Sequence, residues 1–76
     1  EELRKRLNLP AQAKIFVNVA NWNPPVKGQD LLLKAFSRLK CPDCILLLVG
    51  YDTDSPKVGA LINQLGLKGR VWGMGF

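Results

Sequence analysis

The stretch "ILLLVG", residues 45–50, decides the fold. Every residue from Ile45 to Val49 is apolar, so a strand formed here presents apolar side chains on both faces. Strands of that kind are typical of parallel sheets that are covered on both sides. This is the longest purely apolar run in the chain, and it is far shorter than the roughly 20 residues that a membrane-spanning helix needs. It therefore predicts a buried strand of an α/β domain.

Strand-like and helix-like segments alternate on both sides of this run. Residues 14–20, "KIFVNVA", are rich in β-branched and aromatic side chains and predict a first strand. Residues 70–76, "RVWGMGF", predict a third strand that is weakened by its glycines. A short helix is expected in "EELRKRLN", residues 1–8, because Leu3 and Leu7 lie one turn apart.

A helix from about Gly28 to Leu39 is predicted between the first two strands. Its apolar stripe consists of Leu32, Ala35, Phe36 and Leu39, with Leu31 and Leu33 widening it. The polar loop that precedes it, residues 21–26, is expected to be held extended by Pro24 and Pro25.

A further helix is predicted between the second and third strands, within residues 51–66. Ser55 can cap its start, Pro56 suits its first position and Gly66 suits a left-handed exit. Strand, helix, strand, helix, strand is the order that predicts parallel strands joined by right-handed crossovers. We therefore expect an α/β fold, a three-stranded parallel Rossmann-like half-sheet with flanking helices.

Half a doubly wound sheet leaves surface uncovered. With so few helices, one face of the sheet is expected to lie bare, together with the edge where later strands would pair. A fragment of a longer chain explains this best, and pairing of the open edge with a second molecule would also cover it. The alternative is a complete small α/β domain.

The charge balance favours anionic partners. The chain has 76 residues, room for one domain at most, with 11 Lys and Arg against 6 Asp and Glu and a net charge of +5. The cations are scattered rather than gathered in a block, and no strand face interleaves aromatic residues with them, so we expect no nucleic-acid binding. No secretory signal is recognisable, so a cytoplasmic location is expected.

Lys27 is the most informative charged residue. Ligands of open α/β sheets bind beyond the carboxyl ends of the strands, which selects residues 21–28, 50–55 and 75–76. Lys27 lies just before a predicted helix start, where the backbone already favours anions. A phosphate between Lys27 and the helix N–H groups would explain the cation, and Gly28 would allow close approach of the ligand. The alternative is a solvent-exposed loop lysine.

Other motifs carry less chemistry. Cys41 and Cys44 form a C-x-x-C, but it precedes a strand instead of opening a helix, and a zinc site would need two more ligands. We therefore interpret them as incidental thiols and expect no metal. No histidine is present to activate a serine, so a Ser-His-Asp hydrolase is excluded within this chain.

The chain resembles the carboxyl-terminal domain of GT-B retaining glycosyltransferases of the group 1 family. The resemblance rests on "PPVKGQDLLLKAF", the Pro-Asp turn, "LLLVG", and "LGLKGRV" followed by "GF", in that order and at matching spacing. It covers nearly the whole chain, including the leading "LRKRLNLP". It implies that residues 1–76 form the amino-terminal half of a donor-binding domain and are incomplete as a domain.

The resemblance assigns roles around the loop. Lys27 matches the family lysine that contacts the diphosphate of a nucleotide-sugar donor, with help from Gly28. Asn21 stands where the family has an arginine, and Ala20 replaces the preceding glycine. Asn donates a hydrogen bond but brings no charge, which would weaken donor binding by roughly 1.5–3 kcal/mol. Gly50 and Tyr51 are expected to form a wall of the donor site.

The resemblance also implies an activity for the parent protein: transfer of a sugar from a nucleotide-diphosphate sugar to an acceptor, with retention of configuration and without a cofactor. No catalytic residue is expected in this chain, since the acceptor-binding domain and two downstream glutamates are missing, so the isolated chain should be inactive. Many relatives act on lipid-linked acceptors, and a basic surface suits peripheral membrane association. The alternative is a non-enzymatic interaction module or an engineered Rossmann-like fold.

Overall fold

The computed structural model describes residues 5–76, so half of the first predicted helix lies outside the described residues. The elements are β1 (Lys14–Val19), α2 (Pro24–Lys27), α3 (Gln29–Ser37), β2 (Cys44–Val49), α4 (Pro56–Gln64) and β3 (Val71–Gly75). The three predicted strands and the two longer helices are thereby confirmed. No helix in this part of the chain is long and apolar enough to cross a membrane.

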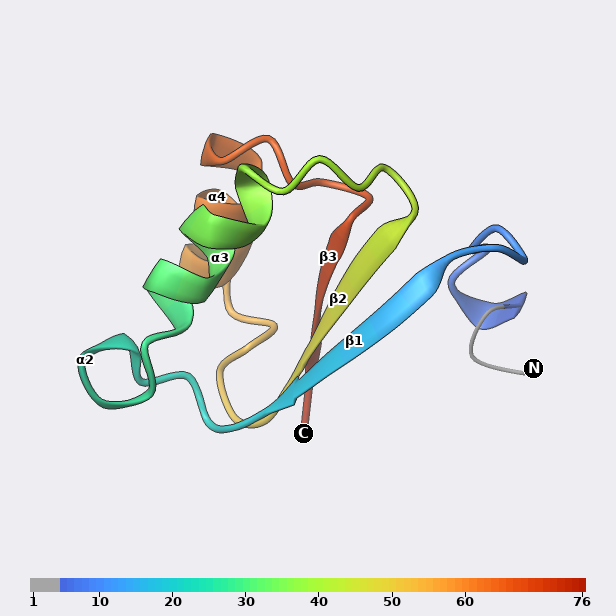
Figure 1. Ribbon diagram of the computed structural model, residues 1–76. Coiled ribbons are helices and arrows are strands. Elements are labelled where there is room, and N and C mark those ends of the chain that lie inside the picture. The colour runs from blue at the N-terminus through green and yellow to red at the C-terminus, as the bar shows by residue number, and fades with distance from the viewer. Residues whose placement is uncertain (1–4) are drawn as a thin grey trace.

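The strands form one parallel sheet in the order β1-β2-β3. Lys14 pairs with Cys44 at one end of the β1–β2 ladder, and Val19 pairs with Val49 at the other. Both crossovers step across the sheet in the same direction, so right-handed connections place α3 and α4 on the same face, as Figure 1 shows. The predicted α/β half-sheet is confirmed.

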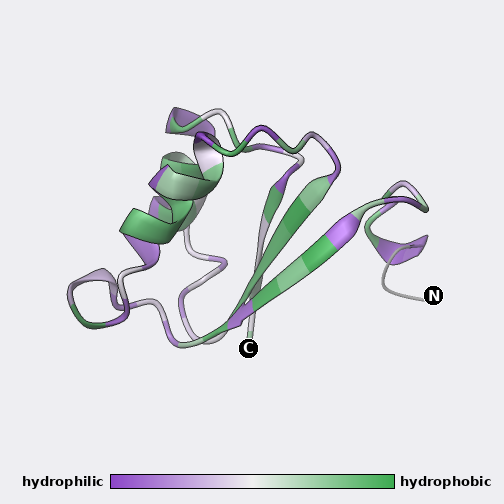
Figure 2. Cartoon of the chain, in the orientation of Figure 1, coloured by the Kyte–Doolittle hydropathy of each residue, from purple (hydrophilic) through white to green (hydrophobic). Residues whose placement is uncertain are grey.

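The core lies on both faces of β2. On the helix side, Leu46 and Leu48 pack with α3 and α4 in a cluster that includes Leu33 and Val58. On the other side, Ile45 and Leu47 are only 4% and 3% exposed. The full set there is Ala13, Ile45 and Leu47, with Leu7, Leu9, Ile15, Trp72 and Met74 packed against them. Figure 2 shows the continuous apolar colour of β2 between the two layers.

The prediction of a bare sheet face is therefore wrong over β2, because the segment before β1 folds back under it. It holds over β1, where Val17 and Val19 remain 56% and 76% exposed. These two side chains share the face of Leu47 and Val49, their neighbours in the parallel register. The part of the sheet left uncovered is thus the β1 edge.

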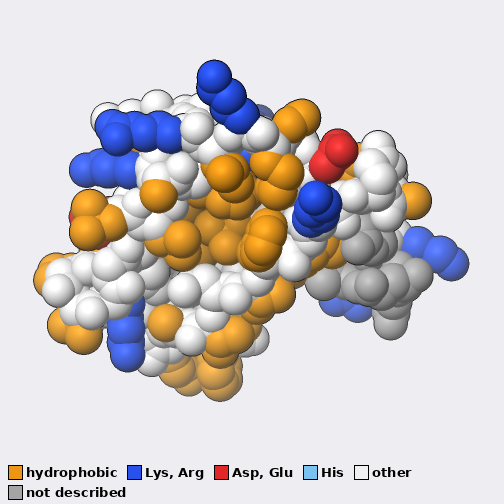
Figure 3. Space-filling view, in the orientation of Figure 1, with side chains coloured by type: hydrophobic (Ala, Val, Ile, Leu, Met, Phe, Trp, Pro, Cys, Tyr) orange, Lys and Arg blue, Asp and Glu red, His pale blue; other side chains and the backbone are white. Residues whose placement is uncertain are grey.

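A hollow of about 300 Å³ adjoins the same edge on the helix side. It is lined by Phe16, Val17, Asn18, Leu32, Phe36, Leu39 and Leu46. Figure 3 shows it as a patch of apolar side chains with Lys and Arg side chains around it. Leu39, predicted to lie on the buried stripe of α3, is 47% exposed, and Leu31 is 66% exposed. The buried side of α3 consists instead of Gln29, Leu33 and Phe36.

The loop after β1 differs from its prediction. Residues 24–27 form the helical turn α2 rather than an extended segment, with proline in its first positions, where the fixed φ of proline suits a helix start. Gly28 follows with a left-handed φ of 68° and links α2 to α3. Lys27 is therefore the last residue of a helical turn as well as the neighbour of a helix start.

The start and end of α4 match the prediction in part. Pro56 occupies the first turn, and Gly66 has a φ of 70° just beyond the helix, as expected. Ser55 occupies the N-cap position, but its side chain makes no capping hydrogen bond. Its hydroxyl is buried without a partner among residues 5–76.

The glycines of β3 have a specific packing role. A Cβ at Gly73 would collide with the carbonyl group of Thr53, and one at Gly75 would lie 2.6 Å from a carboxylate oxygen of Asp54. The loop between β2 and α4 thus lies directly against β3. These glycines, predicted to weaken the strand, leave room for the loop to lie against it.

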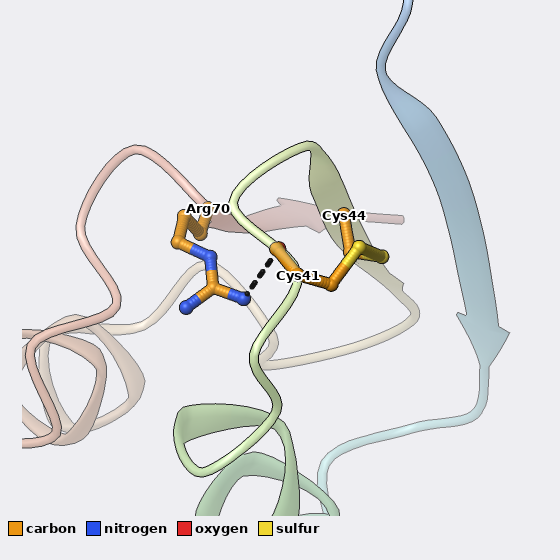
Figure 4. Close-up of a disulfide and its surroundings, with 3 residues drawn as sticks. All are labelled: Cys41, Cys44 and Arg70. Carbon is orange, nitrogen blue, oxygen red and sulfur yellow. Dashed lines mark hydrogen bonds between the residues drawn. A yellow bond between two sulfur atoms is a disulfide. The ribbon is translucent and has the colours of Figure 1, made fainter.

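Cys41 and Cys44 are joined by a disulfide, so the interpretation as incidental thiols is wrong (Figure 4). The bond closes the turn that leads into β2. The carbonyl oxygen of Cys41 accepts two hydrogen bonds, each of 3.0 Å, from the Cys44 N–H and from Nη2 of Arg70. The Arg70 guanidinium also lies 5.0 Å from the centre of the Phe36 ring, which ties the turn to α3.

Reduction of this disulfide is expected to lower the free energy of unfolding by about 2 kcal/mol, the chain-entropy value for a four-residue loop. Urea denaturation with and without dithiothreitol measures the difference. A Cys41→Ser, Cys44→Ser double variant should show the lower stability in both conditions. An equal midpoint for the native chain with and without reductant would contradict the expected contribution of the bond.

Candidate functional site

The loops that follow the three strands meet at one edge of the sheet. Figure 1 shows the loop after β1, the loop after β2 and the end of β3 together at the foot of the sheet. Backbone hydrogen bonds join them: Trp22 donates to the carbonyl of Tyr51 at 2.8 Å, and Gly50 donates to that of Gly75 at 2.8 Å. The three stretches selected from the sequence are thus brought together, as expected for parallel strands.

Gln29 organises the first of these loops. Its side chain is fully buried, although its amide has both a hydrogen-bond donor and an acceptor. Its Oε1 accepts a hydrogen bond of 2.8 Å from the N–H of Asn23. Its Nε2 donates to the carbonyl oxygens of Asn21, at 3.1 Å, and Ala20, at 3.4 Å. All three partners belong to the loop that carries the predicted diphosphate contacts.

Asn21 connects the first loop to the second. Its Oδ1 accepts a hydrogen bond of 3.0 Å from the N–H of Tyr51. The residue is exposed, so its Nδ2 group, with two donor hydrogens, faces solvent rather than the core. The side chain thus makes one structural hydrogen bond through Oδ1 and keeps Nδ2 as a donor. An arginine, as in the family pattern, would be a charged donor at this position.

Lys27 is exposed at the end of α2 and makes no ion pair with any of the described residues. Its N–H donates to the carbonyl of Asn23 at 2.7 Å, which fixes its backbone. Its place at the carboxyl end of α2 suits a cation, although one helical turn has only a small dipole. The conflict with the helix dipole is therefore milder than the sequence alone indicated. The case for a bound anion rests on Lys27 and Asn21 lying on the same loop.

Gly28 acts through its conformation. Its N–H donates to the carbonyl of Pro24 at 2.8 Å and is not available to a ligand. No atom lies within 4 Å of where its Cβ would stand, so its φ of 68° is the constraint on this position. The first turn of α3 offers few backbone donors instead: Gln29 is fully buried, the N–H of Leu31 donates to Oδ1 of Asp30 at 2.9 Å, and the N–H of Leu32 donates to the carbonyl of Gly28 at 3.0 Å.

Gly50 is also explained by packing. It is buried, with a φ of 143°, and a Cβ there would collide with the carbonyl oxygen of Ala20. The absence of a side chain lets the loop after β1 cross the end of β2. Tyr51 beside it is 60% exposed and stacks on Phe76 with ring centres 4.6 Å apart and an interplanar angle of 13°. The two rings form a flat aromatic surface at the edge of the site.

Thr53 holds the second loop against β3. Only 1% of the residue is exposed. Its Oγ1 donates to the carbonyl of Gly50 at 2.8 Å and accepts from the N–H of Gly75 at 2.8 Å. A single hydroxyl thereby satisfies two backbone groups from neighbouring strand ends.

The roles of Gln29 and Thr53 are not predicted by the sequence patterns. Gln29 had a signal that could have found it: together with Leu33 and Phe36 it stands at i, i+4 and i+7 on the buried side of α3, where a polar residue needs a partner. Thr53 had none, because its two partners depend on how the strand ends meet.

Residues 5–76 contain no group of three or more His, Cys, Asp or Glu that could hold a metal ion. What the arrangement offers is the exposed cation of Lys27 and the exposed amide of Asn21 on a fixed loop, which suits the binding of an anion.

The comparisons with known proteins give one match. The family model described as Glycosyl transferases group 1 matches residues 1–76. No curated protein and no solved structure gives a significant match.

Proposed function

This chain belongs to the group 1 glycosyltransferases, and on that premise we propose that its parent protein transfers a sugar from a nucleotide-diphosphate sugar to an acceptor with retention of configuration. Residues 1–76 would be the first half of the donor-binding, carboxyl-terminal domain of a GT-B enzyme. Family membership supports glycosyl transfer. The donor chemistry and the stereochemical outcome are our proposal.

The placement of Lys27 and Asn21, both exposed, on one segment braced by Gln29 is the observation that carries the proposal. Both residues are exposed, and their backbones are fixed through hydrogen bonds to Asn23 and Gln29. The loop lies at the carboxyl end of the sheet, where open α/β folds bind nucleotides. A cation and an amide held at that edge fit a diphosphate better than they fit an uncharged ligand.

The proposed mechanism uses these groups to stabilise the leaving nucleotide diphosphate. The Lys27 ammonium would offset the charge that grows on the phosphate as the bond to the sugar breaks. Asn21 Nδ2 would donate one uncharged hydrogen bond to the phosphate. Gly28 would contribute its left-handed backbone, and Gly50 and Tyr51 would border the donor.

Replacement of Lys27 tests the proposal. Uridine diphosphate, added to the chain labelled for NMR, is expected to shift the amide resonances of residues 21–28. Lys27→Met should weaken this binding by roughly 10- to 100-fold, the value of one charge-assisted hydrogen bond. Lys68→Met removes an equally exposed lysine beside the amino end of β3 and is the matched control, with unchanged binding expected.

Two outcomes of this titration would count against the proposal. Equal loss of affinity in both variants would mean that only net charge attracts the nucleotide. Absence of any response in the native chain would remove diphosphate binding from residues 1–76. Turnover of a nucleotide sugar by the chain alone would contradict the expectation that catalysis needs further segments.

Association is a second candidate function, favoured by the exposed β1 edge. Phe16, Val17 and Val19 are 49%, 56% and 76% exposed on a strand that has a free edge. Such edges pair with other strands. Sedimentation at increasing concentration separates the two functions: association with no nucleotide response favours an interaction module, and a nucleotide response from a monomer favours the transferase.

A further inference from the structure

We propose that Gln29 is the positioning residue of the anion-binding loop: it holds the loop in the form in which Lys27 and Asn21 face the same ligand. This inference rests on the proposed function, because the ligand is the diphosphate of the donor. Gln29 itself does not touch the ligand, since its side chain is fully buried.

The burial of Gln29 needs an explanation. A primary amide taken out of water is costly unless its groups are hydrogen-bonded, and an apolar residue here would continue the buried side formed by Leu33 and Phe36. Gln29 instead accepts from one N–H and donates to two carbonyl groups, all in residues 20–23. Its three side-chain hydrogen bonds thus go to a single segment of the loop.

The partners of Gln29 also fix its chemistry. The two carbonyl groups of Ala20 and Asn21 require an NH₂ group opposite them, and the N–H of Asn23 requires an oxygen. Only one orientation of the amide satisfies all three. A glutamate would fit by shape, but its charged form would set a carboxylate oxygen against two carbonyl oxygens.

The hydrogen bonds continue from Gln29 to the ligand-facing residues. Asn23, held through its N–H by Gln29, accepts through its carbonyl the N–H groups of Val26 at 3.0 Å and Lys27 at 2.7 Å. The turn that ends in Lys27 is therefore built on the residue that Gln29 fixes. Asn21 is held at its carbonyl by Gln29 and at its Oδ1 by Tyr51.

A loop fixed in this way binds an anion without first having to be ordered. The ordering cost of flexible groups is subtracted from affinity, so loosening the loop should weaken binding while leaving every ligand contact chemically present. Loss of a positioning residue and loss of a contact then differ in kind. The first changes loop motion and affinity, and the second changes affinity and its dependence on salt.

Gln29→Met tests the inference because it keeps the length of the side chain and removes all three hydrogen bonds. The fold should survive, since Asn21 and Asn23 are exposed and water can reach the released groups. We expect faster amide exchange at Asn23, lower heteronuclear NOE values over residues 21–27, and roughly tenfold weaker binding of uridine diphosphate and inorganic pyrophosphate. The salt dependence of binding should match the native chain, whereas Lys27→Met should reduce it.

Gln29→Glu provides a second, independent variant. Its carboxylate at pH 8 keeps an acceptor for the N–H of Asn23 but sets an oxygen against the carbonyl groups of Ala20 and Asn21, so it should loosen the loop. Protonation at pH 5 restores a donor for those carbonyl groups and should raise the heteronuclear NOE values of residues 21–27, with the native chain measured in parallel at both pH values. This readout needs no ligand and also serves if Gln29→Met does not fold.

The outcomes separate the two proposals. If the native chain binds uridine diphosphate and both Gln29 variants bind it equally well, Gln29 does not position the loop and the proposed function stands. If the native chain does not bind it, the proposed function fails. In that case, unchanged heteronuclear NOE values over residues 21–27 in the variants would overturn the positioning role, and lower values would uphold the control of the loop by Gln29.

Discussion

Gly73→Ala is expected to remove a large part of the stability of the chain. The new Cβ would collide with the carbonyl oxygen of Thr53 and lie 2.8 Å from its carbonyl carbon and 3.3 Å from the Cα of Asp54. All of these atoms are backbone, so no side chain can rotate away. We expect a loss of about 3–5 kcal/mol, against a total stability of about 4–11 kcal/mol for a chain of this length.

Gly59→Ala is the matched control. Gly59 lies inside α4, and no atom stands within 4 Å of where its Cβ would be. The same added methyl group should raise the free energy of unfolding by about 0.5–1 kcal/mol, because alanine favours a helix interior. Urea denaturation followed by circular dichroism gives both values. A Gly73→Ala chain as stable as the native one would mean that the loop does not lie against β3.

Thr53→Val is expected to have the second-largest effect, with a loss of about 2–4 kcal/mol. Valine reproduces the shape of threonine but has no hydroxyl, so the N–H of Gly75 loses its Thr53 partner in a buried place, and the carbonyl of Gly50 keeps only the backbone N–H of Thr53 at 3.3 Å. A buried backbone group without a partner costs more than a hydrogen bond is worth on average. The effect should be seen as a lower midpoint with an unchanged denaturant slope.

Thr53→Ser serves as the control for that loss. Serine keeps the hydroxyl and removes one methyl group, so it should cost only about 1 kcal/mol. Amide exchange at Gly75 reports the same bond directly and should accelerate in the valine variant alone. If serine and valine were equally destabilising, the packing of the methyl group rather than the two hydrogen bonds would hold the loop.

The sheet could be predicted because its signals are local. The apolar run of β2, the helix period before it and the punctuation of α4 by Pro56 and Gly66 each stand within one element. Local patterns of this kind decide element type and, with the handedness of crossovers, the topology. The same local signals placed Lys27 and Asn21 on a loop at the carboxyl edge of the sheet.

The details of the site could not be predicted because they depend on distant segments of backbone. Gly50 and Gly73 are glycines because carbonyl groups from other loops pass where a Cβ would stand. Gln29 and Thr53 have hydrogen-bond partners that meet only in the folded chain. Residues 24–27 form a helical turn. Two prolines suit the first turn of a helix as well as an extended loop, so propensity alone does not choose between the two conformations.

The order of the strands has a consequence for the synthesis of the chain. In β1-β2-β3 each strand pairs with the one made just before it, so no strand has to be inserted between two others. A growing chain can pair β1 with β2 over six residues as soon as Val49 has left the ribosome, while β3 is still unmade. The sheet then extends at one edge as translation proceeds. The strand order therefore permits the sheet to form in the order in which its strands are synthesised.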